Sequence, residues 1–368
     1  MRILSVVGAR PNFMKVAPII KALACHPAGF SHILVHTGQH YDAKMSAAFF
    51  ADLAMPRPDF DLGVGSGSHA VQTANVMLRI EPVLRDAAPD LVLVVGDVNS
   101  TVAAALTAKK LGLAVAHVEA GLRSFDMTMP EEINRLCTDV IADHLFTTDR
   151  IANANLRREG IPAERVHFVG NVMIDSLLAH RELAERRAFH ASLGLTPRRY
   201  ATLTLHRPSN VDDRDRLAGM LAGLAGLAAE MPVIFPVHPR TRSRIADVGL
   251  APPDGDATRG IRLVDPLGYL EFLDLLMHSR LVLTDSGGIQ EETTILGVPC
   301  VTLRDNTERP VTISEGTNRL AGTSRAGIVA AIAEALASPA VPRMPEKWDG
   351  RAAERIVEII AGLRPGGR

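Results

Sequence analysis

Residues 281–310 read LVLTDSGGIQEETTILGVPCVTLRDNTERP, and this stretch decides the fold class. The apolar run Leu281–Leu283 is typical of a buried parallel strand, and it leads through a polar turn into two consecutive glycines. The pattern predicts a helix from Ile289 to Leu296 and a second strand from Val298 to Leu303. In a strand–turn–helix–strand unit, ligands bind beyond the carboxyl end of the first strand, over the helix N-terminus.

Two carboxylates, Glu291 and Glu292, fall in the first turns of this predicted helix. A phosphate on the glycine turn would bring a ribose with it, and a carboxylate can accept hydrogen bonds from both ribose hydroxyls. The sequence therefore favours a site for the phosphate and ribose of a nucleotide here. The alternative is that the two glutamates only complement the helix dipole.

Length and composition bound the classes of function. A chain of 368 residues predicts about two domains of ordinary size. The net charge is −1, with 40 basic and 41 acidic residues, and only 4% of residues are aromatic, which argues against nucleic acid and acidic membrane surfaces as partners. The cysteines Cys25, Cys137 and Cys300 are too far apart for a disulfide framework or a zinc site, so a reducing cytoplasm fits best. No apolar run is long enough for a signal peptide core or a membrane span.

Strand and helix patterns alternate through both halves of the chain, which predicts an α/β protein with two doubly wound parallel sheets. We expect domains at 1–172 and 173–351, with a charged helix near 174–193 at the boundary and an amphipathic helix at 352–363. A cleft between the two halves is the expected ligand site. The expected strands are residues 3–7, 33–36, 91–95, 114–118, 144–147 and 166–169 in the first half, and 201–205, 233–237, 261–264, 281–283 and 298–303 in the second.

Polar and charged side chains follow many of these strands, where chemistry is usually located in such sheets. They are Arg10, His40, Asp97 and Glu119 in the first half, and His206, His238 and Asp285 in the second. Each has an ordinary alternative: a surface arginine, a helix N-cap for Asp97, or core histidines with satisfied hydrogen bonds. Glu131 after Pro130 could simply be a first-turn acid. Helix capping does not explain Glu119, however, because it sits in a tight turn directly after a buried strand.

Three stretches resemble the UDP-N-acetylglucosamine 2-epimerase family, of the non-hydrolysing type. They are GARPNFMKVAPII at residues 8–20, HVEAGLRSFDMTMPEEINR at 117–135, and TDSGGIQEE at 284–292 with RDNTERP at 304–310. The resemblance implies the glycosyltransferase-B architecture, in which two Rossmann-like domains face a cleft. It also implies that the helix at 352–363 packs back on the first domain.

The resemblance implies a reaction as well. Members of the family invert C2 of UDP-N-acetylglucosamine to give UDP-N-acetylmannosamine, by anti elimination of UDP and its re-addition to 2-acetamidoglucal. This chemistry needs a general base on one face of the sugar and an acid on the other, and it requires neither a metal nor a nicotinamide cofactor. A UDP-sugar substrate and a homodimer are the partners that the resemblance implies.

Site residues carry over position by position. The catalytic set is Asp97, Glu119, Glu131 and His206, without assignment of the acids to faces of C2. Arg123 and Arg135 fall in the middle motif and are expected to orient those acids. The substrate-binding set is Arg10, Lys15, His238, Phe272, Ser286, Gly287, Gly288, Glu292 and Arg309. Gln39 and His40 match a segment near a second, activating UDP-sugar site in bacterial members.

The chain departs from the family pattern at three positions, Asn12, Ser209 and Leu267, which leave the acid–base set intact but put the exact sugar in doubt. A hydrolysing epimerase that releases N-acetylmannosamine and an epimerase of a diacetamido sugar nucleotide are therefore alternatives. A retaining glycosyltransferase and a UDP-sugar sensor without catalysis are rivals from other classes. Neither rival needs the three acids together.

Overall fold

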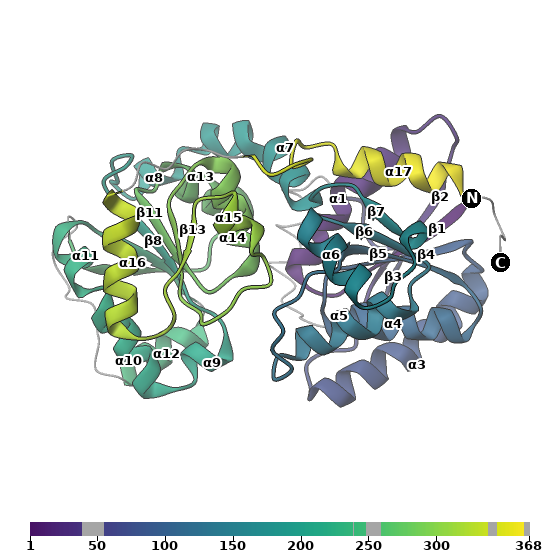
Figure 1. The fold of residues 1–368 in the computed structure, drawn as a ribbon, viewed down its shortest axis with the longest axis horizontal. Helices are drawn as coiled ribbons and strands as arrows, with labels where there is room; N and C mark the ends of the chain where they lie inside the picture. The colour runs from purple at the N-terminus through teal and green to yellow at the C-terminus, as the bar shows by residue number, and fades with distance from the viewer. Residues whose placement is uncertain (39–54, 238, 248–258, 338–343, 364–368) are drawn as a thin grey trace. The chain divides into compact units, whose positions relative to one another are not determined.

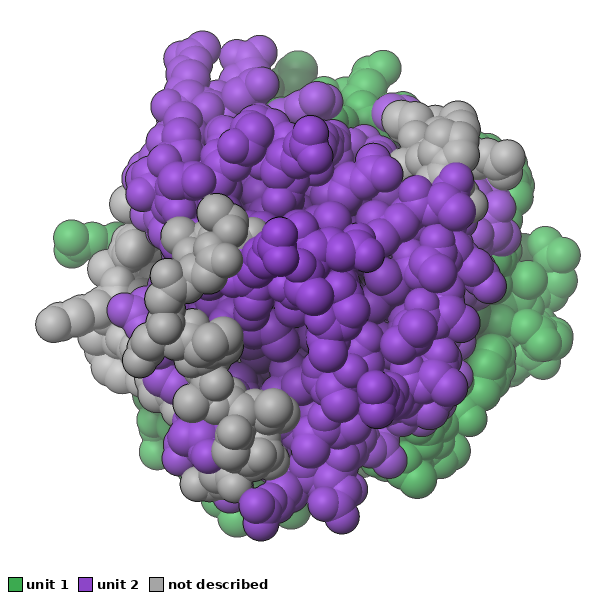
Figure 2. Space-filling view, turned by 90° about the vertical axis from the view of Figure 1, so that its left-hand side faces the viewer, with its two compact units in different colours: residues 1–179, 346–368 green, residues 180–345 purple. Residues whose placement is uncertain are grey.

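The computed structural model describes residues 1–38, 55–237, 239–247, 259–337 and 344–363. The chain divides into two compact units, which are coloured separately in Figure 2. Unit 1 comprises Met1–Ala179 and Glu346–Arg368, and unit 2 comprises His180–Pro345.

Within its described residues, unit 1 is built on seven parallel strands in the order β3-β2-β1-β4-β5-β6-β7, with helices on both faces of the sheet (Figure 1). The strand order reverses between β1 and β4, and ligands of doubly wound sheets bind at such a switch point. All five residues of β4 are buried, as expected for a central parallel strand. The strands are β1 (Arg2–Val7), β2 (Ser31–His36), β3 (Phe60–Asp61), β4 (Leu91–Val95), β5 (Ala114–Ala120), β6 (His144–Thr147) and β7 (Val166–Phe168).

The helices of unit 1 include one that returns from the end of the chain. The segment that leads into it is anchored by the buried Trp348, whose Nε1 donates to the carbonyl of Thr148 at 3.0 Å. Asp175 accepts the first backbone N–H groups of the returning helix, α17, which packs against α1. The helices are α1 (Arg10–Cys25), α3 (His69–Ala87), α4 (Asn99–Lys110), α5 (Pro130–Ile141), α6 (Arg150–Arg158), η1 (Ala163–Arg165), α7 (Val172–Arg187) and α17 (Ala352–Gly362).

The described part of unit 2 repeats the scheme with six parallel strands in the order β10-β9-β8-β11-β12-β13. Here the order reverses between β8 (Ala201–Thr204) and β11 (Leu281–Thr284), so their carboxyl ends mark the switch point. The other strands are β9 (Val233–Pro236), β10 (Ile261–Val264), β12 (Cys300–Thr302) and β13 (Asn318–Leu320). The helices are α8 (Phe189–Ser192), α9 (Pro208–Val211), α10 (Arg214–Gly223), α11 (Ala225–Glu230), α12 (Pro239–Asp247), α13 (Tyr269–His278), α14 (Gly287–Leu296), α15 (Val311–Ser314) and α16 (Arg325–Ala337).

The structure differs from the sequence-based expectation in several local features. The helix predicted near 174–193 is broken, because Ala188 adopts a left-handed backbone with φ of 44° between α7 and α8. The chain passes from unit 1 to unit 2 inside α7, between Ala179 and His180. The short strands β3 and β13 are not predicted by the pattern. Among the described residues, none of the helices combines the length and apolar character needed to span a bilayer.

Candidate active site

Glu119 lies near the carboxyl end of β5, the strand beside β4. The pairing of β5 with β6 shifts register between Val118 and Ala120, so Glu119 occupies a bulge, with a left-handed φ of 74° that is strained for a residue with a side chain. Its Oε1 lies 2.7 Å from Nζ of Lys15 in a buried ion pair. A Cβ on Gly96 would lie 3.0 Å from that Nζ, so the close approach of the lysine favours glycine there.

Asn12 connects the two strand ends at the switch point of unit 1. Its Oδ1 accepts the backbone N–H groups of Gly8 and Ala9, after β1, at 3.1 and 3.0 Å. Its Nδ2 donates to the carbonyl of Val95, the last residue of β4, at 3.1 Å. The departure from the family pattern at this position therefore places a neutral cross-link between β1 and β4.

Asp97 follows β4 and is held by a buried arginine. Nη1 of Arg135 lies 2.5 Å from Oδ2 of Asp97, and Nη2 lies 2.5 Å from Oε2 of Glu132. Burial alone would raise the pKa of Glu132, but the backbone N–H of Ser124 and the Arg135 guanidinium hold it below its usual value. Glu131 is half-buried, and no hydrogen bond or ion pair of its side chain is found among the described residues.

At the switch point of unit 2, His206 after β8 pairs with Asp285 after β11. Nδ1 of His206 lies 2.7 Å from Oδ1 of Asp285, and the imidazole is 61% exposed while the carboxylate is fully buried. Asp285 also accepts the backbone N–H of Arg207 at 2.9 Å and Nδ2 of Asn210 at 3.1 Å. Desolvation lowers the pKa of His206, but the Asp285 carboxylate raises it by more, so the net direction is upward. An accessible imidazole that favours its cationic form is suited to neutralising an anion.

A buried cluster of arginines and glutamates lies at the start of α14. Arg309 donates from Nε to Oε1 of Glu291 at 2.7 Å and from Nη1 to Oε1 of Glu308 at 2.5 Å. Nη2 of Arg304 lies 2.8 Å from Oε2 of Glu308. A Cβ on Gly287 would lie 2.3 Å from Nη1 of Arg309, so only glycine leaves room for this arginine at the first turn of α14.

Glu292 differs from its neighbour because no arginine pairs with it among the residues that the structure describes. Its carboxyl is buried and interacts with the hydroxyl of Tyr269. Burial, together with the charge of Glu291, raises the pKa of Glu292 to about 8. Phe272, one turn further along α13, packs against the apolar cluster that includes Ile289 of α14. Both glutamates are therefore buried, which complementing a helix dipole does not require.

The remaining predicted residues are only partly described. Ser286 is the N-cap residue of α14, yet its side chain makes no capping hydrogen bond within the described structure. Gly288 is the second residue of α14. Arg10 begins α1, but its side chain is outside the described part. Three predicted residues, Gln39, His40 and His238, also lie outside the described residues.

One cluster in the described residues has the composition of a metal site, namely His190, Asp274 and His278. The carboxylate of Asp274 accepts from both the backbone N–H and Nδ1 of His190, at 2.8 and 2.9 Å. Nδ1 of His278 lies 3.2 Å from its other oxygen. Nδ1 of His278 is hydrogen-bonded to the backbone carbonyl of Asp274 at 2.9 Å, and Oδ1 of the carboxylate has no hydrogen-bond partner within the described residues. His278 ends α13, at the opposite end from Tyr269, so the cluster is remote from Glu292.

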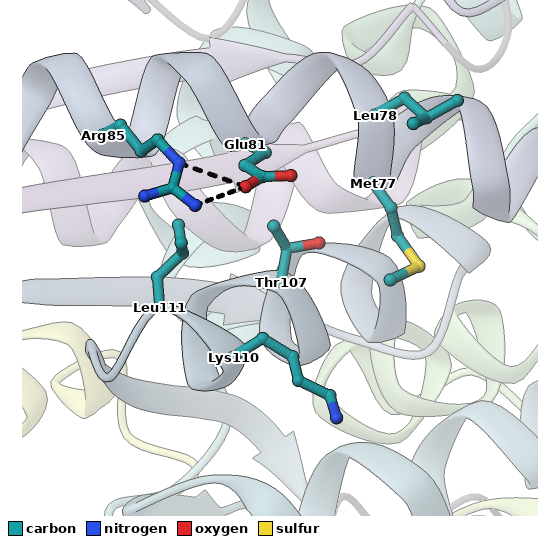
Figure 3. Close-up of a pocket in the computed structure, with 7 residues that line it drawn as sticks. All are labelled: Met77, Leu78, Glu81, Arg85, Thr107, Lys110 and Leu111. Atoms are coloured by element: carbon teal, nitrogen blue, oxygen red, sulfur yellow. Dashed lines mark hydrogen bonds and ion pairs between the residues drawn. The ribbon is translucent and has the colours of Figure 1, made fainter.

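A surface pocket on unit 1 lies between α3 and the last turn of α4 (Figure 3). Its lining includes the ion pair of Glu81 and Arg85, in which Nη2 lies 2.7 Å from Oε1. Asp97 precedes the first turn of α4, whereas Lys110 in this pocket ends the helix. The pocket therefore lies away from the switch point and includes none of the predicted site residues. It is lined by Met77, Leu78, Glu81, Arg85, Thr107, Lys110 and Leu111.

Comparison with known proteins decides the family. The family model described as UDP-N-acetylglucosamine 2-epimerase matches residues 21–361 of this chain. The UDP-N-acetylglucosamine 2-epimerase of Methanocaldococcus jannaschii is 42% identical over 366 residues, which cover 98% of this chain and 99% of that protein. The chain belongs to the UDP-N-acetylglucosamine 2-epimerase family.

Other relatives confirm the fold class and widen the range of sugars in the family. A crystal structure of the M. jannaschii epimerase in complex with UDP-GlcNAc and UDP matches with a TM-score of 0.90, covering 98% of this chain and 99% of that chain at 42% identity. The predicted α/β fold of glycosyltransferase-B type, with two Rossmann-like doubly wound sheets, is therefore confirmed. The UDP-2,3-diacetamido-2,3-dideoxy-D-glucuronate 2-epimerase of Pseudomonas aeruginosa is also 42% identical, over 99% of this chain and 100% of its own length.

Some contacts of the candidate site were not predicted from the sequence. Glu132 had a detectable signal, because its spacing of three residues from Arg135 suits an ion pair on one face of a helix. Tyr269 had none, since its contact with Glu292 joins residues that are distant in sequence. Of the two arginines expected to orient the acids, Arg135 contacts Asp97, whereas Arg123 contacts Asp139 and Glu159.

Proposed function

We propose that this chain catalyses the reversible C2 epimerisation of UDP-N-acetylglucosamine to UDP-N-acetylmannosamine. The base removes the C2 proton while the C1–oxygen bond to the diphosphate breaks, which gives 2-acetamidoglucal and UDP. UDP then adds back to C1 while an acid delivers a proton to the opposite face of C2. The observation that carries this proposal is the placement of Asp97 and Glu119 after two neighbouring strands, β4 and β5, beside the switch point of unit 1. The chain also belongs to the epimerase family, whose reaction uses such acids.

The described contacts of unit 1 suit proton transfer to and from a carbon atom. Each of these two carboxylates is paired with a cation from a helix, Asp97 with Arg135 and Glu119 with Lys15. These pairs fix the carboxylate oxygens in position, which is the first requirement for general acid–base catalysis. We include Glu131 as the third acid, because it precedes Glu132 in a helix that is already tied to Asp97. We do not assign the three acids to faces of C2.

Unit 2 is proposed to bind the UDP group. The first turn of α14 supplies backbone N–H groups at Gly287 and Gly288, as anion-binding helix N-termini do. His206 is accessible and its raised pKa favours the imidazolium, which would stabilise the departing diphosphate. Glu292 is proposed to accept the ribose hydroxyls, and Phe272 to pack against the uracil.

Proton NMR of the purified protein tests the proposed function. We expect UDP-N-acetylglucosamine to convert to an equilibrium mixture with its manno epimer after chelator treatment and without added metal or nicotinamide. Accumulation of free N-acetylmannosamine instead would assign the hydrolysing reaction. Conversion of the diacetamido-glucuronate nucleotide alone would assign that sugar, which the Pseudomonas relative makes the second candidate. We also propose a cytoplasmic homodimer that needs no nucleic acid or membrane partner, and light scattering tests the dimer.

Glu292→Gln is expected to stabilise the ligand-free protein at alkaline pH and to weaken its affinity for UDP. A raised pKa of about 8 means that the folded protein holds a proton, which the carboxyl in the unfolded chain loses above its usual pKa of 4.5. Wild-type stability therefore falls by about 1.4 kcal/mol per pH unit between these values, and glutamine removes that loss. At pH 8.5, where the Glu292 carboxylate is ionised, a charged contact with ribose is worth about 1.5–3 kcal/mol, so UDP affinity at that pH should fall roughly tenfold to a hundredfold.

Thermal melting at pH 5 and pH 8.5 and calorimetric titration with UDP measure the two effects of Glu292→Gln. The exposed Glu334→Gln is the matched control, because it removes one carboxylate from α16. If Glu292→Gln melts at a lower temperature than the wild type at pH 8.5, burial of the ionised Glu292 carboxylate does not destabilise the fold and the prediction is wrong. An unchanged dissociation constant for UDP would remove Glu292 from the nucleotide site.

Asp285→Asn is expected to move the alkaline limb of the pH–activity profile to lower pH. The Asp285 carboxylate raises the pKa of His206, and the imidazolium is present only below that pKa. Without the carboxylate the imidazole loses its proton at a lower pH, and turnover falls with it. The measurement is kcat against pH, with NMR titration of the His206 ring in the same variant. An alkaline limb that stays in place while the pKa of His206 falls would show that the imidazolium does not assist UDP departure.

A further inference from the structure

His117 lies on β5 two residues before Glu119, and its side chain is fully buried. Its Nδ1 is 2.6 Å from Oδ1 of Asp139, on α5, and its Nε2 is 2.7 Å from the carbonyl oxygen of Gly96, after β4. Both partners are hydrogen-bond acceptors, so a ring that donates at each end satisfies them. One buried side chain therefore bridges the end of β4 to α5.

Asp139 extends this bridge to the turn that follows Glu119. Its Oδ2 accepts the backbone N–H of Gly121 at 3.0 Å and lies 2.7 Å from Nη1 of Arg123. The same arginine is paired through Nη2 with Oε2 of Glu159 at 2.6 Å. Burial alone would raise the pKa of Asp139, but His117 and Arg123 hold it below its usual value. The buried Asp139 carboxylate is therefore charged and contacts His117, Gly121 and Arg123 at the same time.

The two backbone groups that this pair holds flank the two acids. Gly96 directly precedes Asp97, and Gly121 follows Glu119 by two residues. We propose that His117 and Asp139 are positioning residues that set the placement of the Asp97 carboxylate relative to that of Glu119. The inference rests on the proposed function, since it assigns a role in a reaction that uses both acids.

Backbone strain at Glu119 explains why the contacts of His117 and Asp139 are needed. Glu119 stands in a bulge at φ of 74°, a conformation that persists only where surrounding contacts hold it. The Gly121–Asp139 hydrogen bond holds the backbone two residues after Glu119, and the hydrogen bond from His117 to Asp139 holds the chain two residues before it. A displacement of about 1 Å in an acid–base group can cost on the order of 100-fold in rate. A simple core role would instead affect only stability.

Two substitutions of His117 break the two halves of the bridge separately. The amide nitrogen of glutamine can take the place of Nε2, so His117→Gln keeps the bond to Gly96 and loses the one to Asp139. The shorter asparagine can replace Nδ1, so His117→Asn keeps Asp139 and loses Gly96. In Asp139→Asn the amide can still accept from Gly121 while the charge is lost. His144→Gln is the matched control, because His144 lies on the adjacent strand β6 and pairs in register with Ala116.

We expect both His117 variants to lower kcat about 10- to 100-fold, with KM and the dissociation constant for UDP within about twofold of the wild type. They should also release more 2-acetamidoglucal and UDP per turnover. His144→Gln should match the wild type, and Asp139→Asn should also lower kcat with unchanged UDP affinity, because it removes the charge that faces His117 and Arg123. Wild-type activity in the same assay tests the proposed function independently.

Two results would overturn the positioning role. One is a pair of folded His117 variants with native kcat, whatever their melting temperatures. The other is a fall in kcat that is matched by an equal loss of UDP affinity, since that indicates general disruption. If neither His117 variant folds, Asp139→Asn decides alone: a native kcat together with native release of 2-acetamidoglucal would refute the inference, and a lowered kcat with unchanged UDP affinity would support it.

Discussion

Asp97→Asn and Glu119→Gln are expected to lower turnover about 10²–10⁴-fold while UDP still binds. Each amide keeps the size of the side chain and one hydrogen-bond acceptor, but it cannot take up a proton from C2. The amides are also neutral, so the ion pairs of Asp97 with Arg135 and of Glu119 with Lys15 become weaker neutral contacts. UDP affinity should persist, because the proposed nucleotide contacts belong to unit 2.

A second consequence separates lost chemistry from lost folding. If re-protonation of C2 is slowed, 2-acetamidoglucal and UDP should escape into solution before they recombine. Chromatography of long incubations detects both products, and thermal melting checks the fold. Asp86→Asn, an exposed acid on α3, is the control. The assignment is wrong if these variants and Glu131→Gln all fold, bind UDP and exchange the C2 proton at near-native rates.

Glu308→Gln is expected to destabilise unit 2 by about 3–5 kcal/mol. The buried Glu308 carboxylate faces three arginines, with Arg309 at 2.5 Å, Arg304 at 2.8 Å and Arg207 at 3.8 Å. These guanidinium groups hold the pKa of Glu308 far below its usual value, although burial alone would raise it. A neutral amide leaves their charge uncompensated in a buried site, and that penalty is the main cost.

The pH dependence of this effect follows from the depressed pKa of Glu308. The ion cluster contributes fully above the unfolded pKa of about 4.5, and its contribution is lost as the pH falls below that value toward the folded pKa. The difference from wild type should be constant at neutral pH and shrink in acid. Chemical denaturation followed by circular dichroism measures it, while fluorescence of Trp348, the single tryptophan, reports unit 1. Glu315→Gln, an exposed acid after α15, is the control; a loss as small as that of the control would contradict the prediction.

The sequence predicts the placement of the proposed acids because the ends of buried strands can be recognised from the sequence. Apolar runs such as 91–95 identify buried parallel strands, and the carboxyl ends of parallel strands lie at one edge of a sheet. Asp97 and Glu119 could therefore be placed near each other without coordinates. The same reasoning places His206 and Asp285 at one switch point, where the structure brings them to 2.7 Å.

Contacts between distant segments are harder to predict. Lys15 was expected at a phosphate, and the structure shows it paired with Glu119, because a long side chain can reach across a sheet edge. Pattern alone could not separate Glu291 from Glu292, since only tertiary packing gives the first an arginine and the second a tyrosine. The bulge at Glu119 leaves no signal in the sequence either, because left-handed backbone usually favours glycine.

Deuterium exchange at C2 tests the central claim most directly. UDP-N-acetylglucosamine is incubated with the protein in deuterated water, and the C2 position of both epimers is followed by NMR. Elimination and re-addition require that the proton at C2 is replaced from solvent, so we predict deuterium at C2 in both sugars as equilibrium is approached. Turnover of the nucleotide with the C2 proton fully retained would contradict proton transfer by Asp97, Glu119 and Glu131. It would also contradict the proposal that this site catalyses epimerisation at C2.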